Sequence, residues 1–278
     1  PWALVARAVP VVGQHATAIH ALSREGDSLT TAAARALAAV DEAELRDESG
    51  RFDIAAIRAA LEPLEASAIA TAEAWDTVTG IDESWLLPPV RSRIHRFENE
   101  LDGARADTAL AVEAVAVAPA MLGADGPRTY FVAFVTPAEA RGSGGFMGNY
   151  GELTAIDGRV RLTRSGRVRE LIDAAPDGTR SLDGPADYVA RYSEMQVEDF
   201  LQDVFASPDF PLNAQVMAQL YPQSGGKDVD GVLSVDPYGL AALVGITGPI
   251  VVEGLPEPLT QANAADVLLR DQYALYPE

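Results

Sequence analysis

The sequence predicts an α/β domain, with a mixed sheet flanked by helices, preceded by an all-α region. Two observations support this prediction. Apolar residues recur at helical spacing in the first part of the chain, whereas short β-branched runs alternate with helical patterns after Gly123. The composition, 48% hydrophobic and 22% charged, is typical of a globular chain with a substantial core. We therefore expect a helical bundle or coiled-coil stalk over residues 1–123 and an α/β domain over residues 124–278.

Three amphipathic, alanine-rich helices are expected in the first region. The first covers residues 14–40, either continuously or broken near Gly26. The second has Asp53 as its N-cap and a kink at Pro63. The third follows a pair of prolines and ends before Pro119. Helices of this kind suit an antiparallel bundle or a coiled-coil stalk.

The first strands are predicted just after this region. Residues 129–135 form an apolar run between two prolines, which is typical of a buried central strand. Residues 146–156 predict a second strand, and Asp157-Gly158 is a strong hairpin signal. The returning strand then begins at Arg159.

The rest of the chain alternates strands with helices. Residues 230–235 predict another buried strand, and Pro237 is well suited to the first position of the helix that follows. Residues 248–252 predict a further strand, and residues 260–273 a helix capped by Thr260. This alternation favours a mixed or parallel sheet covered on both faces.

Composition limits the function classes. A net charge of −20 argues against a general nucleic-acid binder, which needs a surplus of cations to neutralise phosphates. Cysteine is absent, so disulfides and thiolate metal sites are excluded. No apolar run reaches the roughly 18–20 residues needed to span a bilayer. The chain starts at Pro1 without methionine, and we expect it to be cut from a longer protein.

The densest group of candidate functional residues follows the predicted central strand. It contains Glu139, Arg141, Gly144, Gly145 and Asn149. Glycines let backbone N–H groups approach an anion closely, and a guanidinium can hold phosphate or carboxylate oxygens through two parallel hydrogen bonds. The alternative is that the glycines serve a tight bend and close strand packing, with the arginine paired to Glu139 or another acid.

A basic run begins at the predicted hairpin. Arg159 and Arg161 occupy alternate strand positions and so share one face, where they could bind a polyanion. The alternative is a solvated hairpin face that balances nearby acids. Binding to a phosphate-rich partner would weaken steeply as salt rises.

Acidic residues supply the candidates for metal binding and proton transfer. Asp236 follows a predicted strand, where a carboxylate is well placed to hold Mg²⁺ against a diphosphate. It is equally suited to cap the helix that starts at Pro237. Asp209 lies in a rigid Ser-Pro-Asp-Phe-Pro segment, which is either a binding element or a packed turn.

Three segments carry a family resemblance. They are residues 130–150, residues 207–211 and residues 230–237, and together they resemble the bacterial domain-of-unknown-function family 4012. The resemblance extends over nearly the whole chain. Members of this family look like cell-envelope proteins with a membrane helix before the helical region. The resemblance therefore implies a location at the extracellular face of the cell membrane, anchored there in the full-length protein.

The C-terminal half is more distantly similar to the LytR-CpsA-Psr transferases, which attach glycopolymers from polyprenyl-diphosphate carriers to the cell wall. This similarity implies a LytR-CpsA-Psr-like fold and a polyprenyl-phosphate lipid or cell-wall glycan as partner. Arg141 would bind the diphosphate, and Asp236 or Glu139 would hold Mg²⁺ or act as a base. Glycines 144 and 145, Asn149, the hairpin arginines and Asp209 would contribute to the ligand site.

A second class of function is left open by the sequence. In this alternative the chain is a non-catalytic envelope module. The helical stalk would mediate self-association into a homo-oligomer, and the α/β domain would bind a glycan or a partner protein.

Overall fold

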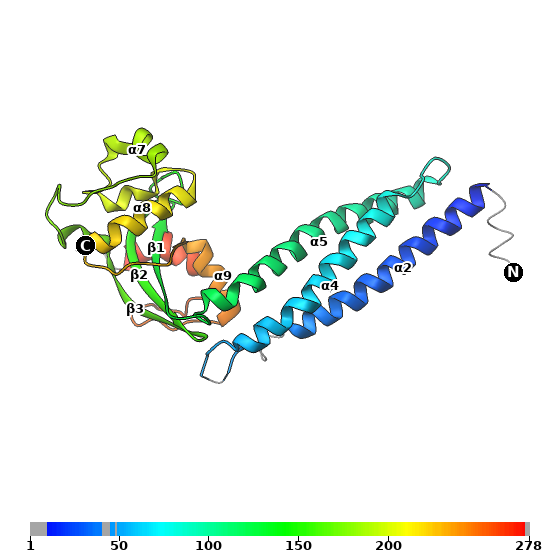
Figure 1. Ribbon diagram of the computed structural model, residues 1–278, viewed down its shortest axis with the longest axis horizontal. Coiled ribbons are helices and arrows are strands. Elements are labelled where there is room, and N and C mark those ends of the chain that lie inside the picture. The colour runs from blue at the N-terminus through cyan, green and yellow to red at the C-terminus, as the bar shows by residue number, and fades with distance from the viewer. Residues whose placement is uncertain (1–9, 41–44, 48, 276–278) are drawn as a thin grey trace. The chain divides into compact units, whose positions relative to one another are not determined.

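The computed structural model describes residues 10–40, 45–47 and 49–275. The chain forms two compact units (Figure 1). The helical unit comprises Pro1–Gly126 and Ile156–Arg159, and the α/β unit comprises Pro127–Ala155 and Val160–Glu278. A mixed α/β fold preceded by a helical region is what the sequence predicted.

Three long helices make up most of the helical unit. They are α2 (Pro10–Ala39), α4 (Ile54–Thr79) and α5 (Pro88–Met121). Small and branched side chains from all three helices, and one from the connection before α5, form its core: Ala18, Ala74, Val78, Leu86, Ile94 and Leu101. Asp53 caps α4 by accepting hydrogen bonds from the backbone N–H groups of Ala55 (2.8 Å) and Ala56 (3.0 Å), as its sequence position predicted.

The first helix is continuous, which is one of the two possibilities that the sequence left open, because α2 continues through Gly26. One expectation for these helices was wrong. The third helix does not end before Pro119, since α5 runs on to Met121. A proline in the last turn removes only one backbone N–H donor from the helix, which this long helix tolerates.

The predicted hairpin turn is present at the tip of the second and third strands. Asp157 and Gly158 both have positive φ, 47° and 81°, which is the requirement of a type I′ turn. Gly158 donates a hydrogen bond to the Leu122 carbonyl (2.8 Å) and accepts one from the Phe52 N–H (2.9 Å). A Cβ on Gly158 would lie 2.1 Å from the Phe52 carbonyl oxygen, so this close approach needs glycine.

The α/β unit is built on a four-stranded mixed sheet with the order β3-β2-β1-β4. The strands are β1 (Arg128–Thr136), β2 (Phe146–Ile156), β3 (Arg159–Arg167) and β4 (Gly231–Val235). β1 pairs antiparallel with β2 and parallel with β4. β1 is therefore an inner strand, as predicted, whereas β4 lies at an edge of the sheet and is only half buried.

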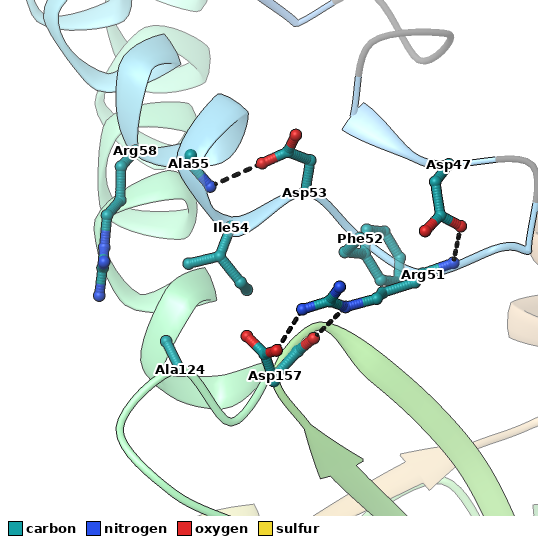
Figure 2. A pocket seen from close by; sticks show the side chains of 9 residues that line it. All are labelled: Asp47, Arg51, Phe52, Asp53, Ile54, Ala55, Arg58, Ala124 and Asp157. Atoms are coloured by element: carbon teal, nitrogen blue, oxygen red, sulfur yellow. Dashed lines mark hydrogen bonds and ion pairs between the residues drawn. The ribbon is translucent and has the colours of Figure 1, made fainter.

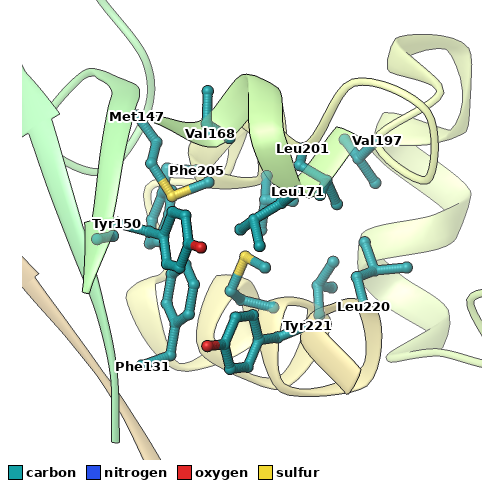
Figure 3. Packing of buried hydrophobic residues seen from close by; sticks show 14 of the residues in the cluster. Phe131, Met147, Tyr150, Val168, Leu171, Val197, Leu201, Phe205, Leu220 and Tyr221 are labelled. Atoms are coloured by element: carbon teal, nitrogen blue, oxygen red, sulfur yellow. The ribbon is translucent and has the colours of Figure 1, made fainter. Parts of the chain in front are cut away.

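One face of the sheet carries the main core (Figure 3). Phe131 and Tyr150 from the sheet meet Tyr221, with the rings of Phe131 and Tyr221 packed edge to face at 4.8 Å. The helical segments of this unit include α6 (Val168–Asp173), α7 (Ala186–Tyr192), η1 (Ser193–Met195), η2 (Leu201–Ala206), α8 (Phe210–Gln223) and α9 (Pro237–Thr247). Leu171, Leu201 and Leu220 bring several of these segments into the core.

The last two predicted elements differ from the structure. Residues 248–252 do not form a strand, and only one bridge, Ile250 with Leu259, is present. The segment is exposed, and an apolar run alone does not identify its pairing partner. The helix predicted from Thr260 begins instead with α10 (Ala264–Asp266) and continues through η3 (Val267–Asp271) and α11 (Gln272–Leu275). Thr260 accepts a hydrogen bond from the Asn263 N–H (3.3 Å) in the preceding turn.

Candidate functional site

The carboxyl ends of β1 and β4 lie side by side, because the two strands run parallel and Phe134 is opposite Val235. Open α/β sheets commonly bind ligands at this edge. Two pockets of the α/β unit meet here, and both are lined by Val135, Val235 and Asp236. This edge of the sheet is the candidate functional site.

The first of the two pockets, which we call the aromatic pocket, has a volume of about 280 Å³. It combines three aromatic rings with two amides and two carboxylates. None of the described residues that line it is an arginine or a lysine. The lining consists of Phe134, Val135, Thr136, Glu139, Phe146, Gly148, Asn149, Val235, Asp236, Pro237, Leu240, Leu268, Gln272 and Tyr273.

A β-bulge brings two of these side chains together. Phe134 is opposite Asn149, but the next residue, Val135, is opposite Met147, so Gly148 is left over. In a regular strand, residues three apart point to opposite faces. Because of the extra residue, Phe146 and Asn149 both lie on the face of Phe134, away from the main core.

The neighbouring pocket, which we call the serine pocket, has a volume of about 410 Å³. Its lining is Val135, Ser143, Gly144, Phe210, Ser234, Val235, Asp236, Gly239 and Leu243. The Ser143 hydroxyl donates to the Ser207 carbonyl (2.5 Å) and accepts from the side-chain amide of buried Asn213 (2.8 Å). The orientation of Ser143 is therefore fixed before any ligand binds.

Asp236 stands at the boundary of the two pockets and caps α9. Its Oδ1 accepts a hydrogen bond from the Gly239 N–H at 2.6 Å, as its position before Pro237 predicted. A Mg²⁺ ion usually needs one or two protein carboxylates together with phosphate or water oxygens. Within the described ranges, the side chains close enough to form a three-ligand metal site are Glu83, His95 and Glu98 of the helical unit. Asp236 is not part of that group, and Glu139 is the other carboxylate that lines the aromatic pocket with it.

Arg141 does not line either pocket. Its Nε donates to Asp203 Oδ1 at 2.7 Å, and its Nη1 donates to the Ala140 carbonyl at 2.9 Å. The guanidinium carbon lies 5.6 Å from the centre of the Phe146 ring. Both members of the ion pair are mostly buried, with side-chain exposures of 24% and 19%. The pairing with an acid that the sequence left open is therefore present, and the acid is Asp203. Glu139 instead lines the aromatic pocket.

The glycines after Arg141 serve close packing. Gly145 has φ of +118°, and a Cβ there would lie 1.9 Å from the Thr136 carbonyl oxygen. A Cβ on Gly142 would lie 2.2 Å from the Ala206 carbonyl oxygen. The loop is closed by a hydrogen bond from the Phe146 N–H to the Glu139 carbonyl (3.0 Å). Of the two glycines proposed as ligand contacts, Gly144 lines the serine pocket and Gly145 is buried against β1.

Three other predicted site residues lie elsewhere. Arg159 belongs to the helical unit and donates to the Ser49 hydroxyl at 3.2 Å. Arg161 is exposed near the start of β3. Asp209 caps α8 by accepting from the Leu212 N–H at 3.4 Å. None of the three lines the aromatic or serine pocket.

Sequence reasoning did not identify Phe134, Gln272 or Tyr273 as site residues. Phe134 lies within a uniformly apolar run, and only alternation along the strand separates it from the core residues Ala133 and Val135. The other two residues come from the C-terminal segment, more than 130 positions away. Only the tertiary structure brings this segment to the sheet.

The helical unit has its own pocket, of about 570 Å³, beside the hairpin tip (Figure 2). Arg51 occupies one wall, where its Nε donates to the Asp157 carbonyl (2.6 Å) and its Nη2 pairs with the Asp157 carboxylate. Arg58, on the opposite wall, lies 3.9 Å from Asp125. Arg51 thus links the start of α4 to the hairpin tip within this unit.

Taken together, the fold and site define an α/β domain with a ligand-sized pocket at the carboxyl ends of two parallel strands. The family model of "Protein of unknown function (DUF4012)" matches residues 125–273, more than half of the chain. The chain belongs to this family. Neither the search of curated proteins nor that of solved structures gave a match. Across the part of the chain that the structure describes, no helix combines the length and apolar character needed to cross a bilayer.

Proposed function

We propose that the α/β unit is a non-catalytic envelope module that binds an uncharged glycan in the aromatic pocket. The observation that carries this proposal is the composition of that pocket. Phe134, Phe146 and Tyr273 supply ring faces, whereas Asn149 and Gln272 supply amides. Glu139 and Asp236 add carboxylate acceptors.

This combination matches both the apolar C–H groups and the polar hydroxyl groups of a sugar. The C–H groups of a pyranose are apolar and pack against aromatic faces, which bury a large area at little entropic cost. Each hydroxyl can donate and accept one or more hydrogen bonds. Amides offer both roles, and carboxylates accept from hydroxyl donors. A mostly apolar pocket with a few convergent polar groups is also the general form of a small-molecule site.

The charge of the pocket favours an uncharged ligand. Its carboxylate lining residues are Glu139 and Asp236, and neither an arginine nor a lysine is among the described residues that line it. A phosphate or uronate placed between them would be repelled, and the chain as a whole carries a net charge of −20. Glycan hydroxyls carry no such penalty.

The LytR-CpsA-Psr-like transferase activity stays a prediction. It needs a cation to hold a polyprenyl diphosphate, and Arg141 is the candidate. That guanidinium pairs with Asp203, and its carbon lies 5.6 Å from the centre of the ring of Phe146, which lines the aromatic pocket. These contacts favour the binding module over the transferase. The proposed site of action remains the extracellular face of the membrane, with an anchor upstream and self-association through the helices.

Saturation-transfer NMR and calorimetry test the proposal directly. Glucose, mannose and N-acetylglucosamine would be titrated into the whole chain, and bound sugar would be recovered and weighed by mass spectrometry. We expect one of them to bind and to be recovered intact. Asn149→Ala should weaken binding about tenfold, because one hydrogen bond to a ligand in a partly buried site is lost.

Two controls make this test decisive. Asn99→Ala changes the same residue type at an exposed position of α5 and should leave binding unchanged. Undecaprenyl phosphate in detergent provides the competing ligand. Failure of all three sugars and of their short oligomers to bind contradicts the proposal, and tight binding of undecaprenyl phosphate that is lost in Arg141→Ala supports the transferase instead.

A further inference from the structure

Asp236 lines both pockets of the candidate site. The aromatic and serine pockets share Val135, Val235 and Asp236, so they adjoin at the end of β4 and the first turn of α9. Their volumes, about 280 and 410 Å³, each fall near the small end of the range for ligand sites, roughly 300–1,000 Å³. Each pocket alone suits a short piece of a ligand.

We infer that the ligand is an oligosaccharide whose successive sugar units occupy both pockets, one on each side of Asp236. This inference rests on the proposed glycan-binding function. It adds a second subsite and a ligand class of more than one sugar unit.

The serine pocket provides serine hydroxyls that can take part in hydrogen bonds, whereas the aromatic pocket provides aromatic rings and side-chain amides. Ser143 and Ser234 both contribute hydroxyls to it. A hydroxyl has one donor and two acceptor positions. Ser143 uses its donor on the Ser207 carbonyl and one acceptor position on Asn213, which leaves a second acceptor position for a ligand hydroxyl.

The support behind Ser143 is rigid. Asn213 is fully buried, and its amide donates both to Ser143 Oγ and to the Ser207 carbonyl, each at 2.8 Å. The Ser143 backbone N–H also donates to the Phe205 carbonyl at 3.1 Å. A polar group held in this way loses little further entropy when a ligand binds.

Asp236 provides the link between the subsites. Its Oδ1 is fixed by the Gly239 N–H, which sets the orientation of the whole carboxylate. In the part of the chain that the structure describes, no donor is assigned to Oδ2. That oxygen can accept a hydrogen bond from a hydroxyl of a sugar unit in either pocket. An uncharged chain can lie across this acid, whereas a chain with an anionic group there is repelled.

The test compares sugar monomers with oligomers on the whole chain. Glucose, mannose and N-acetylglucosamine would each be measured by calorimetry against their linear tetramers: cellotetraose, mannotetraose and chitotetraose. For the sugar that binds, we expect the tetramer to bind at least about tenfold more tightly than the monomer, because it fills a second subsite. Ser234→Phe should fill the serine pocket from an exposed strand position. It should remove the tetramer's advantage over the monomer.

The control is Ser165→Phe, the same substitution at an exposed position of β3 that lines neither pocket. It should keep the tetramer's advantage. A tetramer that binds within about twofold of its monomer overturns the second subsite and leaves the proposed function standing. Equal weakening of monomer and tetramer by Ser234→Phe also overturns it, whereas binding of neither monomers nor tetramers overturns the proposed function itself.

Discussion

At the scale of single residues, Glu152 shows how a buried charge is kept in this fold. It lies in the middle of β2 with a side-chain exposure of 4%. Burial alone would raise the pKa of the Glu152 carboxyl, but hydrogen bonds from Lys227, Thr163 and Tyr221, each at 3.0 Å, outweigh it. The net result is a pKa below the ordinary value of 4.5. Lys227, the only lysine of the chain, thus has a structural role.

This lowered pKa predicts a pH dependence of stability. The ionised form of Glu152 is favoured in the folded state. Its stabilisation is therefore complete above the unfolded pKa near 4.5 and is lost as pH falls through the lower folded pKa. We expect Glu152→Gln to cost about 1–3 kcal/mol at neutral pH, with a smaller loss of stability on acidification than the wild type. Urea unfolding at several pH values between about 3 and 7 measures this difference.

The matched variant is Glu194→Gln, which changes an exposed carboxyl in η1. Its stability should follow the wild-type pH profile. A Glu152→Gln profile that runs parallel to the wild type would show that the carboxyl has the same pKa folded and unfolded.

The residue scale also shows what the sequence could and could not predict. The capping roles of Asp53 and Asp236 depend on residues two or three positions away, so the sequence contained the information. The partner of Arg141 lies 62 positions away, and no local pattern indicates it. Arg180 is buried and donates hydrogen bonds to the carbonyls of Leu171, Ile172 and Glu198. No local pattern indicates these contacts either.

At the scale of elements, the site depends on the turn from β1 into β2. The loop brings Gly145 against the Thr136 carbonyl, and the bulge at Gly148 turns Phe146 and Asn149 to one face. The strands and the hairpin were predictable, because their apolar alternation and the Asp-Gly turn are local signals. The bulge was not, since it is defined by the register between two strands. The strand expected at residues 248–252 was wrong for a related reason, since its pairing could not be read from an apolar run.

Two glycine substitutions test the close packing of the loop in this element. Gly145→Ala should destabilise the fold by on the order of 3 kcal/mol, because its Cβ would collide with the Thr136 backbone at a positive φ. Gly148→Ala should change stability by less than about 1 kcal/mol, since the nearest atom, Cε1 of Phe146, lies 3.9 Å away. Urea unfolding of both variants measures this contrast. Equal stabilities would mean that the loop does not pack as described.

At the scale of the whole molecule, the pocket arises from contacts between distant parts of the chain. β1 and β4 are about 100 positions apart, and the segment with Gln272 and Tyr273 is further still. Alternating strands and helices predicted a mixed sheet, and family membership agrees with the motifs of the sequence. The strand order and the parallel pairing of β1 with β4, which place the pocket, required the structure. The net charge of −20 adds a long-range preference against anionic ligands.

The most direct test of the glycan-binding account is the NMR signal of the side-chain amides while a bound sugar is titrated in. Asn149 and Gln272 line the aromatic pocket, and Asn99 lies on α5 of the helical unit. The account predicts saturable shifts of the Asn149 and Gln272 amides with a common dissociation constant, and none for Asn99. Saturable binding that leaves Asn149 and Gln272 unmoved while it shifts the Arg141 side-chain signal would contradict the account and place the ligand elsewhere.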